Sequence, residues 1–168
     1  MQNSHIIGGE FGIDLQGFQY AQSNNGFLEG IYKYSSGRSA LYYILLDVQK
    51  RYGITTAYLP NYLCSSVVVA AEKSQVKVVF YNLNDQLEID IEKFPLDDNE
   101  KAAVLLINYF GLKSLQLQVE LVRSISMEAI VIEDDVQAFY EFCKPELAAD
   151  YKFTSLRKTF ACPDGGLV

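Results

Sequence analysis

Two short runs of almost entirely apolar residues constrain the fold of this chain more than any other feature. Residues 102–110 read AAVLLINYF and residues 129–135 read AIVIEDD. Near-continuous apolar runs of this length are typical of strands that are buried on both faces. The segment between them, residues 114–128, has the apolar spacing of an amphipathic helix. Strand, helix and strand in this order predict a parallel pair with a right-handed crossover.

The same alternation runs through the rest of the chain. Strands are expected at residues 55–60 and 76–83, and helices at 35–53 and 61–75. The helix at 35–53 has the clearest signals, because Ser36 and Gly37 form a cap and Gly53 follows its last basic residues. The expected fold is therefore α/β, with three αβα layers and a mostly parallel sheet.

The division of the chain follows from where this periodicity begins. Residues 1–34 are rich in Gly, Asn, Gln and Tyr and show little periodicity. They are predicted to form a mostly irregular N-terminal arm, in which one short helix is compatible with the sequence. Residues 35–168 are predicted to form one domain.

Composition excludes several classes of function. The 168 residues are 49% hydrophobic, which suits one soluble core, and the net charge of −7 disfavours nucleic acids and anionic membranes as partners. No signal peptide is recognisable, and no apolar run is long enough to cross a bilayer. A single histidine argues against histidine-based triads and metal sites, and three cysteines show no paired spacing. These features predict a reduced, cytoplasmic protein.

Polar residues stand at the predicted strand ends. Ligands of parallel α/β sheets bind beyond the carboxyl ends of the strands. Asn108, Asp134 and Lys158 fall at or just after such ends and are expected to line one edge. Strand alternation should point Glu133 and Asp135 away from Asp134. Taken alone, Asp134 is equally well explained as an exposed turn residue.

Lys158 is the second candidate. An isolated Arg–Lys pair such as 157–158 is most often a solvated surface feature. Here the pair follows a strand-like segment and precedes the turn at residues 163–166. Desolvation by Phe153 and Phe160 would make such an amine nucleophilic.

The helix start at residues 35–38, SSGR, offers an anion site. Free backbone N–H groups, a glycine and two hydroxyls at a helix N-terminus suit a phosphate group. The simpler interpretation is an ordinary N-cap. Neither the dinucleotide-binding glycine pattern nor a Walker sequence is present.

Taken together, the ordered segments resemble the DegT/DnrJ family of pyridoxal-phosphate (PLP) sugar aminotransferases of fold type I. The segments are SSGRSAL, YLPNYLCSSV, VVFYNLNDQLEID, INYFG, VIEDDVQAF, and SLRK followed by PDGGLV. The resemblance covers residues 30–168, of which VIED-x-x-Q-A is the most specific part. It implies a partial PLP-binding large domain without the C-terminal small domain, in a homodimer with a shared active site.

The resemblance also implies roles for three residues around the cofactor ring. Asp134 would face the pyridine nitrogen and keep it protonated, so that the ring withdraws electrons. Gln137 would lie near the phenolic oxygen of the ring. Lys158 would form the imine with the cofactor and then carry a proton between substrate and cofactor.

The phosphate group and the ring face are implied to have further contacts. Ser155 and the helix start at Ser36, Gly37 and Arg38 would hold the phosphate. Family members usually have this serine farther from the lysine. Cys64 stands where the family commonly has an aromatic residue stacked on the ring, so Tyr62 or another residue would have to take over that contact.

The implied reaction is a two-step transamination, with glutamate as amino donor and a keto sugar nucleotide as acceptor. Lys158 argues against the related sugar dehydratases, which have histidine at this position. The chain ends at residues 165–168, where the next strand should begin, so an incomplete and inactive fragment with an unpaired sheet edge is expected. One alternative is a truncated, non-catalytic α/β module that self-associates without binding PLP. Another is a small doubly wound domain for a different phosphate ligand.

Overall fold

The computed structural model describes residues 30–144 and 148–168 and confirms the predicted α/β class. The seven-stranded sheet has the order β1-β7-β6-β5-β4-β2-β3, and only β7 runs against the other strands. The strands are β1 (Lys33–Tyr34), β2 (Thr56–Pro60), β3 (Lys77–Tyr81), β4 (Ala103–Ile107), β5 (Ile130–Asp134), β6 (Tyr151–Ser155) and β7 (Gly166–Leu167). The helices are α1 (Gly37–Tyr52), α2 (Ser65–Ser74), α3 (Gln116–Ile125) and α4 (Phe139–Phe142), with 3₁₀ turns η3 (Ile91–Lys93), η4 (Tyr109–Gly111) and η5 (Leu156–Lys158).

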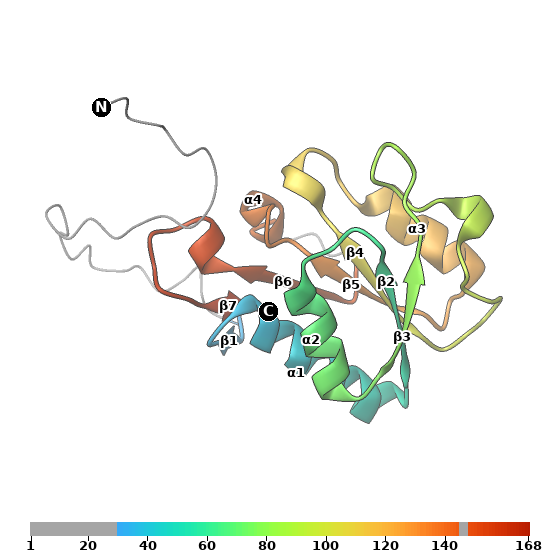
Figure 1. Cartoon of the computed structure of the whole chain (residues 1–168), viewed down its shortest axis with the longest axis horizontal. Helices are drawn as coiled ribbons and strands as arrows, with labels where there is room; N and C mark the ends of the chain where they lie inside the picture. The colour runs from blue at the N-terminus through green and yellow to red at the C-terminus, as the bar shows by residue number, and fades with distance from the viewer. Residues whose placement is uncertain (1–29, 145–147) are drawn as a thin grey trace, which may run out of the picture.

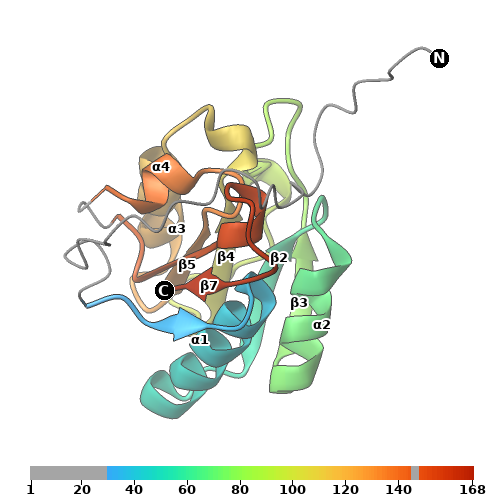
Figure 2. The same cartoon turned by 90° about the vertical axis from the view of Figure 1, so that its left-hand side faces the viewer.

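The helices form the two outer layers of a three-layer αβα arrangement. Helices α1 and α2 cover one face of the sheet, and α3 and α4 lie on the other face (Figures 1 and 2). No helix in residues 30–144 or 148–168 is long and apolar enough to cross a membrane.

The capping residues in the sequence predicted α1 correctly. The Ser36 side chain accepts a hydrogen bond from the Ser39 N–H at 3.1 Å, which satisfies one of the free donors at the helix start. Gly53 ends the helix in the left-handed conformation at φ 69°. The predicted strand at 102–110 is shorter than expected and ends at Ile107. Phe110 has φ 61°, which no strand residue adopts, and the chain turns there into η4.

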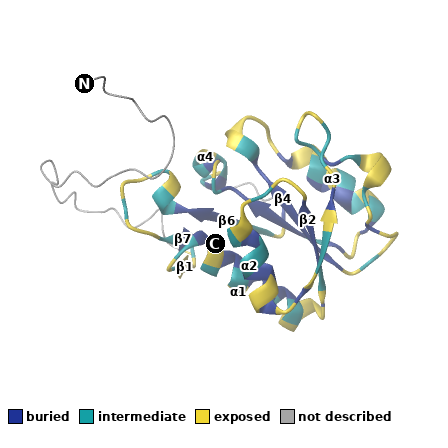
Figure 3. Ribbon diagram, viewed as in Figure 1, coloured by how far each residue is buried: buried dark blue, intermediate teal, exposed yellow. Residues whose placement is uncertain are grey.

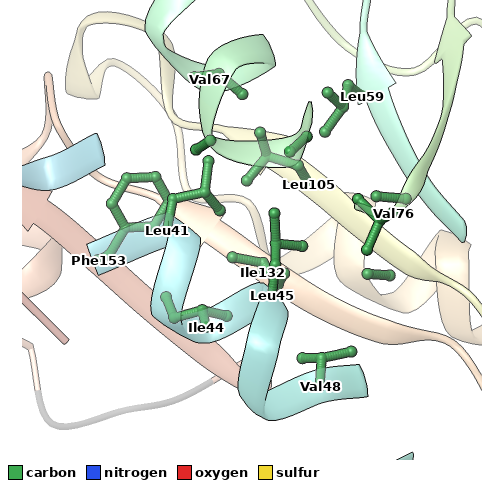
Figure 4. Packing of buried hydrophobic residues seen from close by; sticks show 14 of the residues in the cluster. Leu41, Ile44, Leu45, Val48, Leu59, Val67, Val76, Leu105, Ile132 and Phe153 are labelled. Carbon is green, nitrogen blue, oxygen red and sulfur yellow. The ribbon is translucent and has the colours of Figure 1, made fainter. Parts of the chain in front are cut away.

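Strand alternation sorts the side chains of the sheet between the two faces. Residues 103, 105 and 107 of β4 and residue 132 of β5 pack toward α1 and α2, whereas residues 104, 106 and 131 pack toward α3. Figure 4 shows the hydrophobic core between the sheet and helices α1 and α2. Figure 3 shows that the central strands of the sheet are buried. Figure 4 labels Leu41, Leu45 and Val67 of the helices near Leu105, Ile132 and Phe153 of the sheet.

The C-terminal strand corrects one prediction. The sheet was expected to be left with an unpaired edge at residues 165–168, but β7 is paired on both sides. Thr154 and Ser155 of β6 pair with Leu167 and Gly166, and β1 pairs with β7 from the other side. The end of the predicted N-terminal arm thus belongs to the sheet and covers that edge, while residues 1–29 lie outside the described residues.

Candidate active site

A cavity of about 420 Å³ opens at the carboxyl ends of the parallel strands. All eight residues predicted to bind or react with the cofactor line it, although they come from four separate parts of the chain. They are Ser36, Gly37, Arg38, Cys64, Asp134, Gln137, Ser155 and Lys158. The fold therefore brings motifs that are far apart in the sequence together at one site.

Register explains why the floor of the cavity is formed as it is. Asp134 pairs with Ile107 of β4 on one side and with Phe153 of β6 on the other. Residues in register point to the same face of a sheet, so all three side chains face the α1 and α2 layer. All three line the cavity, with an acid between two apolar side chains.

Asp134 is a buried acid without a cationic partner. It is 5% exposed, and its Oδ1 accepts one hydrogen bond, from the Val136 N–H at 2.9 Å. Burial raises the pKa of Asp134 to about 7, and the hydrogen bond from Val136 partly opposes the rise. No lysine or arginine in the described part of the chain forms an ion pair with it. Such a carboxyl group is stabilised in its ionised form by any cationic group that enters the cavity.

The start of α1 forms a second wall together with the end of β6. A Cβ at Gly37 would lie 2.9 Å from the Ser155 Cβ, so only glycine allows the helix to approach this closely. The Ser36 hydroxyl caps Ser39, and the N–H groups of Gly37 and Arg38 precede the first intrahelical donor. These N–H groups and the Ser155 hydroxyl offer donors to an anion at one corner of the cavity.

Lys158 lies on the third wall, at the end of η5. The segment is held by the bond from the Leu156 N–H to the Gly165 carbonyl at 2.8 Å, and Arg157 pairs with Asp164 at 3.7 Å. The expected desolvation is not observed, because Lys158 is exposed. Phe160 packs instead on Phe139, with ring centroids 4.9 Å apart.

Two tyrosines form an aromatic wall near Cys64. The Tyr109 hydroxyl donates to the Tyr62 carbonyl oxygen, and the two ring centroids are 5.7 Å apart. Burial, together with the nearby Asp134, raises the pKa of Tyr109. Cys64 accepts a bond from the Ser66 hydroxyl at 3.2 Å, and this bond lowers the pKa of its thiol. Tyr109 was missed by the sequence argument, since the only signal was its place just after a strand end.

Asn108 does not line this cavity, contrary to expectation. It is buried, and its side-chain amide donates to Asp135 Oδ1 at 3.2 Å. Strand β4 ends one residue earlier, at Ile107, and Asn108 turns toward the face that carries Glu133 and Asp135. The predicted separation of Glu133 and Asp135 from Asp134 is confirmed, because neither lines the cavity.

These walls fit PLP by the chemistry of their groups. A buried carboxyl group without a counter-charge suits a protonated ring nitrogen, and the amide of Gln137 suits a ring oxygen. The donors at the α1 start suit a phosphate, and the exposed amine of Lys158 faces the same space. The arrangement can therefore hold a ring that is cationic at one end and carries a phosphate.

Several solved structures share the fold of the described residues. A candidate sugar aminotransferase of Streptococcus pneumoniae in its PMP form has a TM-score of 0.66 at 16% identity, over 82% of this chain and 40% of that chain. NtdA from Bacillus subtilis with bound PMP has a TM-score of 0.63 at 22% identity, over 82% and 32%. A GDP-4-keto-6-deoxymannose-3-dehydratase variant with bound GDP-perosamine has 0.63 at 17% identity, over 82% and 38%.

The likeness is one of fold. The described domain matches part of the structure of DegT/DnrJ/EryC1/StrS aminotransferases and of other fold-type I PLP enzymes. The chain spans about two fifths of their length or less. No protein-family model and no curated protein matches the sequence.

Proposed function

We propose that this chain is the cofactor-binding part of a PLP-dependent sugar aminotransferase. The observation that carries the proposal is the shared cavity of Asp134 and Lys158. An acid without a counter-charge and an accessible amine lie on two walls, and the start of α1 supplies anion donors on a third.

Each residue then has a defined role. Asp134 holds the ring nitrogen in its protonated form, and Gln137 orients the ring oxygen. Gly37 and Arg38 N–H groups, with the Ser36 and Ser155 hydroxyls, bind the phosphate. Lys158 provides the amine for covalent attachment and then moves a proton at the substrate carbon. When bound, PLP supplies an electron-withdrawing ring that stabilises negative charge at that carbon.

The residue at position 158 favours transamination over dehydration. A dehydratase and a candidate sugar aminotransferase share the fold with TM-scores of 0.63 and 0.66, so the fold does not select the reaction. A lysine can both bind the cofactor and transfer the proton, which transamination requires. We propose glutamate as amino donor and a keto sugar nucleotide as acceptor, in a cytoplasmic homo-oligomer.

The chain covers 32–40% of the three solved structures, and the remainder of such proteins would complete the substrate side of the site. We propose that the chain as given binds PLP weakly and is inactive by itself.

Borohydride trapping tests the proposal. The protein is incubated with PLP, reduced, digested and mapped by mass spectrometry, beside K158A and the surface control K113A. Label on Lys158 in the parent and in K113A, and its loss in K158A, is the expected result. Label on Lys144 or Lys152 would show that another lysine is the attachment site.

The competing function is a non-catalytic module without PLP. The same experiment decides for it if no lysine is labelled at saturating PLP. This alternative expected self-association through an unpaired edge at the C-terminal strand. In the structure β1 pairs with that edge, which makes the alternative weaker.

A further inference from the structure

A second carboxyl cluster lies behind the cavity, and the proposed cofactor site does not use it. Glu133 and Asp135 flank Asp134 and are 5% and 0% exposed. Burial raises the pKa of both acids. The positive charge of the nearby Lys152 on β6 opposes this rise in part. Two buried acids beside a third would be strongly destabilising if all were ionised.

The backbone of Asp135 anchors the turn that follows β5. Its N–H donates to the Phe153 carbonyl at 2.9 Å. Its own carbonyl accepts both the Thr154 hydroxyl at 3.0 Å and the Ala138 N–H at 2.9 Å. These bonds fix residues 135–138 against β6. Gln137, which lines the cavity, is held by this turn.

One of the two carboxyl oxygens of Asp135 has no hydrogen-bond partner. Oδ1 accepts the Asn108 amide at 3.2 Å. Oδ2 is buried, and it is the only such side-chain N or O atom without a hydrogen-bond partner in residues 30–144 and 148–168. A protonated carboxyl oxygen is a donor, and a side-chain hydrogen bond with Glu133 is one of the causes that raise the pKa of Asp135. A proton on Oδ2 that is donated to Glu133 would therefore give Oδ2 a hydrogen-bond partner.

We propose that Asp135 is a positioning residue whose Oδ2 carries a proton at neutral pH, donates to Glu133, and so holds the turn that places Asp134 and Gln137 on the cavity wall. The neutral Asp135 adds no second charge behind Asp134. A cation in the cavity then meets Asp134 as its nearest acid. The part of this proposal that concerns the cofactor rests on the proposed function, whereas the shared proton does not.

The pH dependence follows from the groups around Asp135. They are Glu133 on β5, Lys152 on β6, Cys143 after α4, and Glu141 on α4 beside Glu133. Burial, with a further contribution from Glu133, raises the pKa of Asp135 to about 8. An unfolded chain releases this proton near pH ~4. The contribution of Asp135 to the free energy of unfolding is therefore largest below pH ~4. It decreases as the pH rises toward about 8 and is constant above that pH.

Unfolding equilibria without PLP test the shared proton. Wild type, D135N and the exposed control D98N are unfolded by denaturant from pH 4 to pH 9. The Asn amide keeps the donor and cannot ionise. The unfolding constant of wild type divided by that of D135N should rise up to about tenfold per pH unit until pH ~8 and then level. Parallel curves for wild type and D135N would overturn the proposal, and D98N should follow wild type.

Two further measurements test the shared proton without D135N. E133Q places an amide donor beside Oδ2, so it should also remove the pH-dependent term above pH ~7. Infrared spectra of Asp134→Asn, in which Asp134 cannot contribute, should show a protonated carboxyl band that disappears around pH ~8. Its absence at pH 7.5 contradicts the shared proton.

The positioning role has its own readout in PLP affinity. Ionisation of Asp134 strengthens PLP binding as the pH rises, so a loss of affinity above pH ~8 has the opposite sign. Wild type should lose several-fold affinity between pH 8 and pH 9, and D135N should not. Equal losses in both proteins overturn the positioning role. Failure of PLP to label Lys158 refutes the proposed function and leaves the unfolding result valid.

Discussion

The backbone of Ser36 lies so close to Gly166 that a Cβ at position 166 would stand 2.2 Å from the Ser36 carbonyl oxygen. This contact joins the start of α1 to β7, and β7 is hydrogen-bonded to the end of β6 that carries Ser155. The phosphate corner of the cavity therefore depends on a glycine in the last strand. The glycine serves a close approach of two backbones, since its conformation is one that other residues adopt.

Gly166→Ala should destabilise the protein by about 3 kcal/mol, because the Ser36 backbone cannot rotate out of the way as a side chain can. Gly53→Ala is the matched control. Gly53 has open space around its Cβ position, so its cost, about 1 kcal/mol, comes only from its left-handed φ of 69°. Denaturant unfolding measures both. Equal losses would show that the contact at Ser36 relaxes easily.

Asp134→Asn should stabilise the protein without cofactor while weakening its binding of PLP. Burial raises the pKa of Asp134 to about 7, so the unfolded chain ionises first and stability falls between pH ~4 and about 7. Asn removes this loss, and the gain above pH 7 is at most roughly 4 kcal/mol.

Thermal and denaturant unfolding at pH 4 and pH 8 check this prediction. The two proteins should be nearly equally stable at pH 4 and differ at pH 8. A titration with PLP, followed by its visible absorbance, should show weaker binding by Asp134→Asn. A variant that is less stable than wild type at pH 8 contradicts the account of Asp134 as an unpaired buried acid.

Sequence reasoning located the features that depend on local chemistry and on strand alternation. The Ser36 cap and the Gly53 end of α1 follow from the conformations these residues prefer. The position of Asp134 on the α1 face follows from its place at a strand end, and the same alternation put Glu133 on the other face.

Features that depend on distant contacts were beyond the sequence. Strand β7 has two residues, too few for any periodicity, and its pairing with β1 connects opposite ends of the described chain. The place of Tyr109 depends on the turn at Phe110, whose φ of 61° no pattern indicates for a phenylalanine. The exposure of Lys158 was missed for a similar reason, because Phe160 packs on Phe139 instead.

Cys64→Phe should raise the affinity for PLP about two- to tenfold. An aromatic side chain at this place on the cavity wall can stack on a bound ring, a contact worth about 0.5–1.5 kcal/mol. The wild-type thiol offers no such surface and is exposed at the start of α2. Cys64→Ala is the control, because it removes the thiol without adding a ring. A gain in both variants would mean that the thiol itself opposes binding.

Ser155→Ala should weaken PLP binding about tenfold or more and leave the affinity for pyridoxal, which has no phosphate, unchanged. The Ser155 hydroxyl lies beside Gly37 at the start of α1, and a hydrogen bond to a charged group contributes about 1.5–3 kcal/mol. The control is Ser35→Ala, since the Ser35 hydroxyl is exposed and bonds to Ser39 at 2.9 Å outside the cavity wall. Equilibrium titration of both ligands against all three proteins provides the measurement. Equal weakening of PLP and pyridoxal by Ser155→Ala would place the phosphate elsewhere in the cavity.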